Sequence, residues 1–197
     1  MKPLSSSGKV EFYANSRSAW RQWLQKNHQA QTSIWLVIYK KDSGVPSLTY
    51  EEAVEEALCF GWVDSKPNKR DEKSYQLFFA VRKPKSVWSK INKTRIKKLQ
   101  AAGLMMPAGL AKIEAAKKDG SWTVLDAIEE LIMPDDLGKA FRNNQTASDF
   151  FNAFPPGVKK GIYQWIISAK REETRSKRIA ETVALAQKNI RANQWRK

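Results

Sequence analysis

The residues best suited to chemistry in this sequence lie between Trp62 and Asn92, where cations, a carboxylate, serines and tryptophans alternate. Asp64 ends a short extended segment, Arg82 ends the next one, and Ser86 or Ser89 begins a helical pattern. A helix N-terminus offers unpaired N–H groups and arginine offers a planar fork of donors, so this combination suits a phosphate or a carboxylate. We expect a site for a small anionic ligand, formed by Trp62, Asp64, Lys66, Arg82, Ser86, Trp88 and Asn92.

The same residues also have a purely structural interpretation. In that case Asp64 and Arg82 form an ion pair, Ser86 caps a helix and Trp88 packs in the core. Asp64 alone is too little for acid–base catalysis, because that chemistry needs a second group with a matched pKa. A hydrolase-like enzyme that uses Asp64 is therefore only an alternative, and we expect binding rather than catalysis.

Other catalytic and metal chemistries lack the residues that they need. His28 is the only histidine and Cys59 the only cysteine, so we expect neither a metal site built from these ligands nor a Ser-His-Asp triad. The sequence has no P-loop and no G-x-G-x-x-G motif, and we expect no cofactor. Cys59 lies in the last turn of a helical pattern, where the helix dipole disfavours a thiolate, and we interpret it as a buried structural residue.

The net charge of +15 on the 197-residue chain is distributed unevenly. Residues 62–103 hold 12 Lys/Arg and 3 Asp/Glu, and residues 157–197 hold 11 and 3. Two basic segments favour an anionic partner, although lysines that only solvate helix faces would explain the same counts. Nucleic-acid binding through the basic helix 90–98 and the C-terminal tail is a second hypothesis. Its expected contacts are Lys90, Lys93, Lys97 and Arg196.

The rest of the composition is that of a soluble globular protein. One cysteine permits no internal disulfide, which fits a reducing compartment. The N-terminal stretch MKPLSSSGKVEFY has no apolar run of signal-peptide length, and no stretch reaches the ~20 apolar residues of a membrane-spanning helix. We expect a cytoplasmic protein without a membrane span.

The elements that must position the candidate site follow from local patterns. Ser16 precedes an amphipathic helical pattern, and residues 34–39 are nearly continuously apolar and rich in β-formers. Thr49 and Glu52 have the spacing of a capping box, and Gly61 stands where that helix would end in a left-handed residue. The stretches WVDSK and SYQLFFAVR, separated by a polar connection, predict two strands of a hairpin.

From Ser86 onward the patterns are helical. The stretch SVWSKINKTRIKKLQAAG places Trp88, Ile91, Ile96 and Leu99 near one face and ends at a glycine. We therefore expect an α+β fold: a small, mostly antiparallel sheet with helices, followed by an all-helical C-terminal region. The predicted domains are residues 1–103 and 104–197.

Four stretches resemble the YdeI/OmpD-associated family, also called bacteriocin-protection. They are LTYEEAVEEALCFGWVDSKP, RKPKSVWSKINKTRIKKLQAAGLM, DGSW and AKREETRSKRIAETVALAQKNIRANQWR. The resemblance covers nearly the whole chain and implies an N-terminal α+β domain, a helical OmpD-associated C-terminal domain and a binding or stress-protection role without established enzymatic activity. It implies no catalytic residues. The family often has a Ser/Thr-Pro-Arg sequence where this chain has Ala80-Val81-Arg82, a departure that keeps the arginine.

Overall fold

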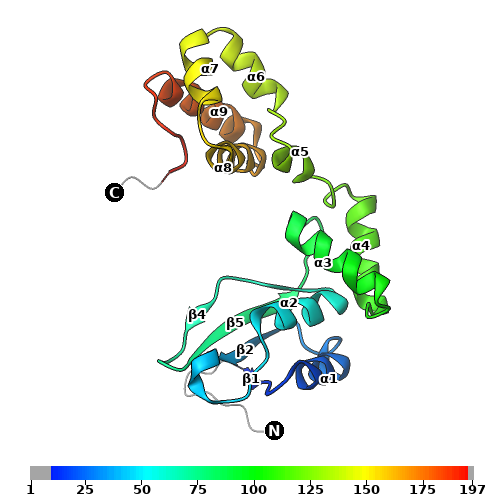
Figure 1. Cartoon of the computed structure of the whole chain (residues 1–197). Helices are drawn as coiled ribbons and strands as arrows, with labels where there is room; N and C mark the ends of the chain where they lie inside the picture. Colours follow the sequence, from blue (N-terminus) through cyan, green and yellow to red (C-terminus); the bar gives the residue numbers. More distant parts are fainter. Residues whose placement is uncertain (1–9, 195–197) are drawn as a thin grey trace. The chain divides into compact units, whose positions relative to one another are not determined.

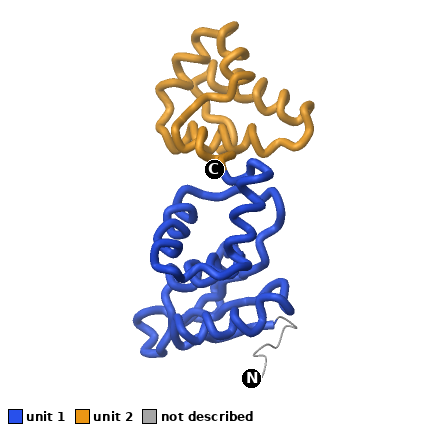
Figure 2. Tube along the Cα trace, turned by 90° about the vertical axis from the view of Figure 1, so that its right-hand side faces the viewer, with its two compact units in different colours: residues 1–122 blue, residues 123–197 orange. Residues whose placement is uncertain are grey.

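The computed structural model describes residues 10–194 and divides the chain into two compact units. The first unit ends at Trp122 and the second begins at Thr123 (Figure 2). The sequence patterns placed the change at residue 103. The units divide later because the helix that follows, Pro107–Lys118, packs against the helix Tyr50–Cys59 of the first unit.

The first unit contains a five-stranded sheet and the helices packed on it (Figure 1). Its elements in chain order are β1 (Glu11–Tyr13), α1 (Arg17–Asn27), β2 (Ser33–Tyr39), the 3-10 helix η1 (Lys41–Ser43), α2 (Tyr50–Cys59), β3 (Trp62–Asp64), β4 (Asn68–Lys69), β5 (Ser74–Val81), α3 (Lys90–Ala101) and α4 (Pro107–Lys118). The strand order is β1-β2-β5-β3, with β4 also paired to β5. Only the β1–β2 pairing is parallel among the described strands, which confirms a mostly antiparallel sheet.

One face of the sheet forms the core of this unit together with α1 and α2. Cross-strand pairs such as Leu36 with Leu77 and Ile34 with Phe79 place apolar side chains on the same face, because side chains alternate along a strand. Trp20, from α1, packs into this cluster and donates its indole N–H to the Ala53 carbonyl of α2 at 3.0 Å.

The predicted capping residues of α1 and α2 are confirmed. Ser16 caps α1 by accepting from the Ala19 N–H. Thr49 and Glu52 form the reciprocal capping box of α2. Gly61 follows α2 with φ +75°, and this left-handed conformation turns the chain into β3.

A buried carboxylate joins α1, α2 and the segment before α4. Glu56 is 2% exposed and accepts from Arg17 Nε and Arg21 Nη1, each at 2.6 Å. Arg21 also donates to the Leu104 carbonyl at 2.8 Å. Because both carboxylate oxygens of Glu56 are paired, the charge is compensated inside the fold.

The start of α4 lies against the end of α2 at very short range. The Met106 N–H donates to the Cys59 carbonyl at 3.1 Å. A Cβ at Gly109 would lie 2.2 Å from the same carbonyl oxygen, a distance that no side chain tolerates. The absence of a side chain at this position allows α4 to approach α2.

The second unit is entirely helical in its described part, which confirms the predicted helical C-terminal region. Its helices are α5 (Asp126–Glu129), α6 (Asp135–Arg142), α7 (Gln145–Asn152), α8 (Pro156–Ile167) and α9 (Glu172–Ala186). Phe141, Phe151 and Ile162 lie in its own apolar core, separate from that of the first unit. Arg175 of α9 holds Asp136 of α6 with two hydrogen bonds, at 2.5 and 2.9 Å.

Two details of the prediction for residues 86–99 are wrong. The helix α3 begins at Lys90 with Ser89 as its N-cap, so Ser86 does not present a helix N-terminus. Ile91 is 65% exposed rather than buried. Since α3 turns Ile96 and Leu99 inward, a residue five positions before Ile96 lies well outside that face.

None of the helices in residues 10–194 is both long enough and apolar enough to cross a membrane.

The contact at Gly109 predicts an asymmetric response to Gly→Ala substitutions. Gly109→Ala should lower the free energy of unfolding by about 2 kcal/mol, because the new methyl group overpacks the α2–α4 contact. Gly161→Ala is the matched control, since a Cβ at Gly161 in α8 would meet no neighbouring atom within 4 Å, and it should be neutral or stabilising. Denaturant unfolding of both variants measures the difference; equal effects would contradict the close approach.

Candidate functional site

Of the predicted ligand residues, the structure brings Arg82, Ser86 and Trp88 together at one pocket. Trp62 is 1% exposed and belongs to the core instead. Lys66 is exposed in the connection after β3, and neither Asp64 nor Asn92 lines this pocket. The site is therefore smaller than the predicted one and centred on the end of β5.

Arg82 leaves β5 with its side chain buried, 4% exposed. Its backbone N–H donates to the Gly61 carbonyl, and its guanidinium carbon lies 3.6 Å from the centre of the Trp88 ring. Nη1 donates to the Val87 carbonyl at 3.0 Å and to Ser86 Oγ at 3.3 Å. Nε is buried and has no hydrogen-bond partner. Stacking on the indole fixes the plane of the guanidinium.

No carboxylate among residues 10–194 forms an ion pair with Arg82. Burial lowers the pKa of its guanidinium from the ordinary value to about 10, an effect that the charge of Asp64 partly opposes. Arg82 is thus still protonated at neutral pH, in a place where a positive charge is costly. The predicted Asp64–Arg82 ion pair does not form; the Asp64 carboxylate instead accepts from the Tyr50 hydroxyl at 2.8 Å.

A tight turn carries the chain from Arg82 to Trp88. The Ser86 N–H donates to the Lys83 carbonyl, Pro84 occupies the second turn position, and Lys85 has φ +59°. This is the arrangement of a type II turn, in which the third position normally favours glycine. Ser86 Oγ donates to the same Lys83 carbonyl at 2.7 Å. Ser86 therefore stabilises the turn and orients Arg82, and its role is not that of a helix cap.

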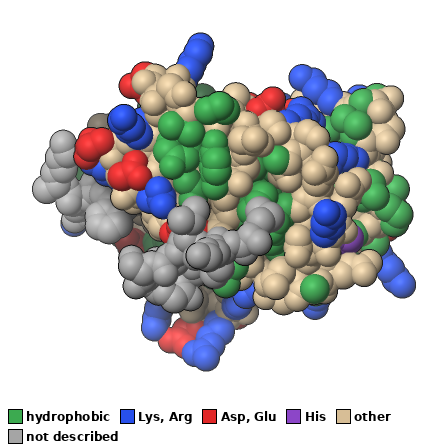
Figure 3. Space-filling view, turned by 90° about the horizontal axis from the view of Figure 1, so that it is seen from below, with side chains coloured by type: hydrophobic (Ala, Val, Ile, Leu, Met, Phe, Trp, Pro, Cys, Tyr) green, Lys and Arg blue, Asp and Glu red, His purple; other side chains and the backbone are tan. Residues whose placement is uncertain are grey.

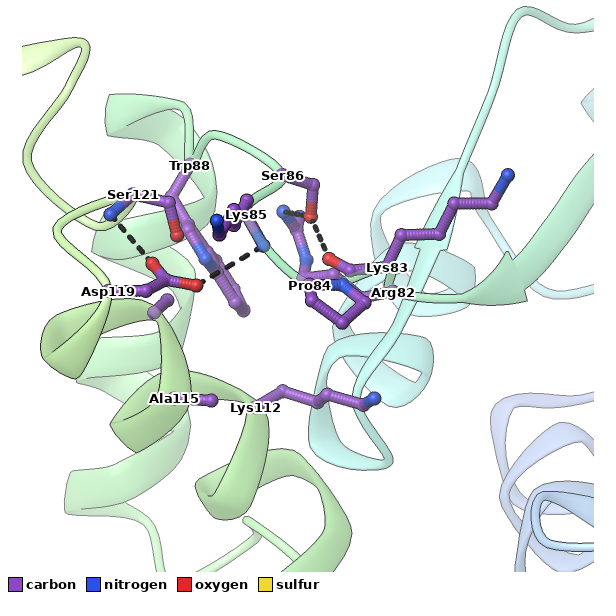
Figure 4. A pocket seen from close by; sticks show the side chains of 11 residues that line it. Arg82, Lys83, Pro84, Lys85, Ser86, Trp88, Lys112, Ala115, Asp119 and Ser121 are labelled. Atoms are coloured by element: carbon purple, nitrogen blue, oxygen red, sulfur yellow. Dashed lines mark hydrogen bonds between the residues drawn. The ribbon is translucent and has the colours of Figure 1, made fainter.

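The opposite wall of the pocket comes from α4 and the turn after it. Lys112, Ala115 and Ala116 lie on the helix, and Asp119 and Ser121 follow it. One oxygen of the Asp119 carboxylate accepts from the Lys85 N–H at 3.2 Å and the other from the Ser121 N–H at 2.9 Å. Asp119 thus connects the turn at Lys85 to the end of α4 (Figure 4).

The pocket has a volume of about 50 Å³, enough for one small polyatomic group or a few waters. Within residues 10–194, four buried side-chain nitrogen or oxygen atoms lack a hydrogen-bond partner. Three of the four belong to residues that line this pocket: Arg82 Nε, Trp88 Nε1 and Ser121 Oγ. Ser121 lies close enough to Asp119 to lower the pKa of that carboxyl, so Arg82 Nε and Trp88 Nε1 are the clearer cases of buried donors without an acceptor.

Lys112, Asp119 and Ser121 were missed in the sequence. They follow Arg82 by 30 or more positions and carry no motif of a binding site. The stretch DGSW contains two of them, Asp119 and Ser121, but only as part of the family resemblance. Nothing in the spacing shows that the turn after α4 faces the turn after β5.

Asp64 occupies a separate polar cluster. Burial, together with the hydrogen bond to Asp64, raises the pKa of the Tyr50 phenol to about 12, so Tyr50 remains a donor at neutral pH. Arg95 lies over the Tyr50 ring and donates to Asn92 Oδ1 at 3.1 Å. Asp64 and Asn92 are therefore neighbours of one cluster, although they do not reach the pocket.

The residues predicted to contact nucleic acid differ in their exposure. Lys90 and Lys97 are exposed on α3, whereas Lys93 is half-buried with its ammonium 5.2 Å from the centre of the Trp122 ring. Arg196 lies outside the described residues. On the face of the molecule drawn in Figure 3, the coloured basic side chains are scattered between neutral ones rather than gathered in one patch.

Neither His28 nor Cys59 belongs to a metal cluster in the described part of the chain. The His28 ring is hydrogen-bonded through Nδ1 to the Leu24 carbonyl and lies beside Phe60. Cys59, the last residue of α2, is fully buried, and its carbonyl accepts from the Met106 N–H just before α4.

Two family models match the chain. The first, described as "Domain of unknown function (DUF8412)", matches residues 12–112. The second, described as "Bacteriocin-protection, YdeI or OmpD-Associated", matches residues 130–189 and confirms the resemblance for the second unit. No curated protein and no solved structure matches the chain significantly.

The burial of Cys59 predicts slow thiol chemistry. Desolvation raises the pKa of the thiol, so the reactive thiolate is suppressed at neutral pH. Native protein should react with a maleimide or disulfide reagent roughly 100-fold or more slowly than free cysteine, because reaction requires local opening. Denatured protein is the control and should react as free cysteine does; fast labelling of the native state would contradict a structural role.

Proposed function

We propose that this protein, which belongs to the family of unknown function DUF8412 through residues 12–112, binds a small anionic ligand in the pocket between Arg82 and Asp119. The observation that carries the proposal is the buried, unpaired charge of Arg82. The match of residues 130–189 supports a protection-type protein.

A charge buried inside a protein is energetically costly unless a group of opposite charge pairs with it. Buried polar groups are nearly always hydrogen-bonded, and buried charges are nearly always paired. Arg82 Nε and Trp88 Nε1 are both donors and neither has an acceptor. Water would accept their hydrogen bonds but would leave the guanidinium charge uncompensated, whereas an anion supplies both acceptors and charge.

The surroundings of the pocket add to the attraction for an anion. Lys83, Lys85 and Lys112 line the pocket beside Arg82, against the single carboxylate of Asp119. The small volume favours one oxyanion group over a large ligand. The turn conformation of Lys85 is sterically unfavourable for a residue with a side chain, and such conformations concentrate at functional sites.

Replacing Arg82 with methionine should weaken anion binding without unfolding the protein. A charge-assisted hydrogen bond contributes ~1.5–3 kcal/mol, so the Kd for inorganic phosphate should rise roughly 10- to 100-fold. Methionine fills similar space over Trp88, and the substitution removes an unpaired buried charge, so the free energy of unfolding should change little. Calorimetric titration with phosphate and denaturant unfolding measure the two quantities.

Lys97→Ala is the matched control for charge, since Lys97 is an exposed cation of α3 that does not line the pocket. Its affinity for phosphate should equal that of the unmodified protein when the ionic strength is held constant. No binding of phosphate by the unmodified protein, or equal loss in both variants, would overturn the proposal. Severe destabilisation by Arg82→Met with unchanged affinity would assign Arg82 a structural role.

Nucleic-acid binding by α3 is a second candidate, favoured by the exposure of Lys90 and Lys97. Neither of these lysines forms an ion pair within the described residues, so both are available to phosphates. A duplex or single-stranded oligonucleotide should then bind with an affinity that falls steeply as salt increases, and Lys90→Ala/Lys97→Ala should reduce the slope. Binding that does not depend on salt would exclude this mode.

A further inference from the structure

We infer that the pocket selects a tetrahedral oxyanion that still carries a proton at neutral pH, such as inorganic phosphate, over one that carries none, such as sulfate. This inference rests on the proposed function and concerns the chemical class of the ligand. The two walls of the pocket differ in hydrogen-bonding character, and this difference determines the selection. The wall from residues 82–88 offers donors, and the wall after α4 offers an acceptor.

The donor wall can bind any oxyanion. Arg82 Nε and Trp88 Nε1 are buried N–H groups without a hydrogen-bond partner, on stacked planar side chains with 3.6 Å between the guanidinium carbon and the ring centre. Phosphate and sulfate have the same tetrahedral shape and both present oxygen acceptors. These donors therefore do not distinguish the two anions.

The acceptor wall does distinguish them. An ionised carboxylate accepts hydrogen bonds but donates none, and it has room for about four. In Asp119 one acceptance from each of the Lys85 and Ser121 N–H groups leaves capacity for more. The Ser121 side chain is the largest cause that lowers the pKa of the Asp119 carboxyl, and the two N–H groups lower it further, so this carboxyl is ionised at neutral pH.

A ligand that reaches both walls must donate to Asp119 as well as accept from Arg82. Hydrogen phosphate can do so through its remaining P–OH group, because that group is a donor. Sulfate at neutral pH has only acceptor oxygens, so it would place a negative oxygen against a carboxylate without a shared proton. Because Asp119 lies on the exposed side of the pocket, we expect a moderate effect rather than exclusion of sulfate.

The test compares phosphate and sulfate by calorimetric titration at neutral pH and constant ionic strength, with the unmodified protein and with Asp119→Asn. The unmodified protein should bind phosphate about 10-fold more tightly than sulfate, the difference expected from one charge-assisted hydrogen bond. In Asp119→Asn the amide oxygen can still accept from the Ser121 N–H, whereas the new N–H₂ group gives up the hydrogen bond from the Lys85 N–H and can donate to either anion. The preference should then fall to about 2-fold or less, chiefly because sulfate binds better.

The outcomes separate this inference from the proposal on which it rests. Equal affinity of the unmodified protein for the two anions would overturn the inference but leave the pocket as an anion site. An unchanged preference in Asp119→Asn would also overturn it, since another group would then make the distinction. If neither anion binds, both the inference and the proposed function fail. Equal affinity of the unmodified protein for the two anions overturns the inference even if the variant is unstable.

Discussion

The ion-pair network of Glu56 is the interaction on which the first unit depends. This carboxylate is almost completely buried and is held by Arg17 and Arg21 of α1, while Arg21 also reaches the Leu104 carbonyl. The Glu56 carboxylate and its arginine partners therefore connect α1, α2 and the segment before α4, which are distant in sequence. Removing one partner from such a network leaves an uncompensated buried charge, so its members must be retained together. Leu104 lies just before α4, so this network also holds the segment that leads into α4 and one wall of the pocket.

Two buried charges of the same unit differ in whether they have a partner of opposite charge. Glu56 has a cationic partner for each oxygen, whereas Arg82 has an aromatic ring, two neutral acceptors and no carboxylate. Stability alone would favour a partner of opposite charge for Arg82 as well as for Glu56. An unpaired arginine is useful where the partner comes from outside the protein, because a site that must bind an anion cannot already be neutralised.

Local features of the fold could be predicted from the sequence because their causes are local. The caps at Ser16 and Thr49 depend on hydrogen bonds between residues three positions apart, and Gly61 depends on its own backbone conformation. The choice between Ser86 and Ser89 as the cap of α3 could not be made in this way. Both are serines before a helical pattern, and only the turn at Lys85, fixed by the distant Asp119, decides between them.

Of the residues that line the pocket, only those on the side formed by the segment from Arg82 to Trp88 could be predicted from the sequence. Arg82 and Trp88 stood out because a cation and an aromatic residue end a strand and precede a helix. The α4 side depends on how closely two helices pack, and this depends on the missing side chain at Gly109. A glycine inside a helical pattern gives no indication of which carbonyl it allows to approach.

The helix α4 also determines where the first unit can be cut for expression as a fragment. The matched segment of residues 12–112 ends inside α4, which runs from Pro107 to Lys118. A fragment ending there would lose half of this helix, together with Asp119, Ser121 and the Trp122 ring that packs on Trp88. A fragment that extends to Trp122 retains the complete helix and every residue of the pocket, and is the appropriate unit for soaking and titration.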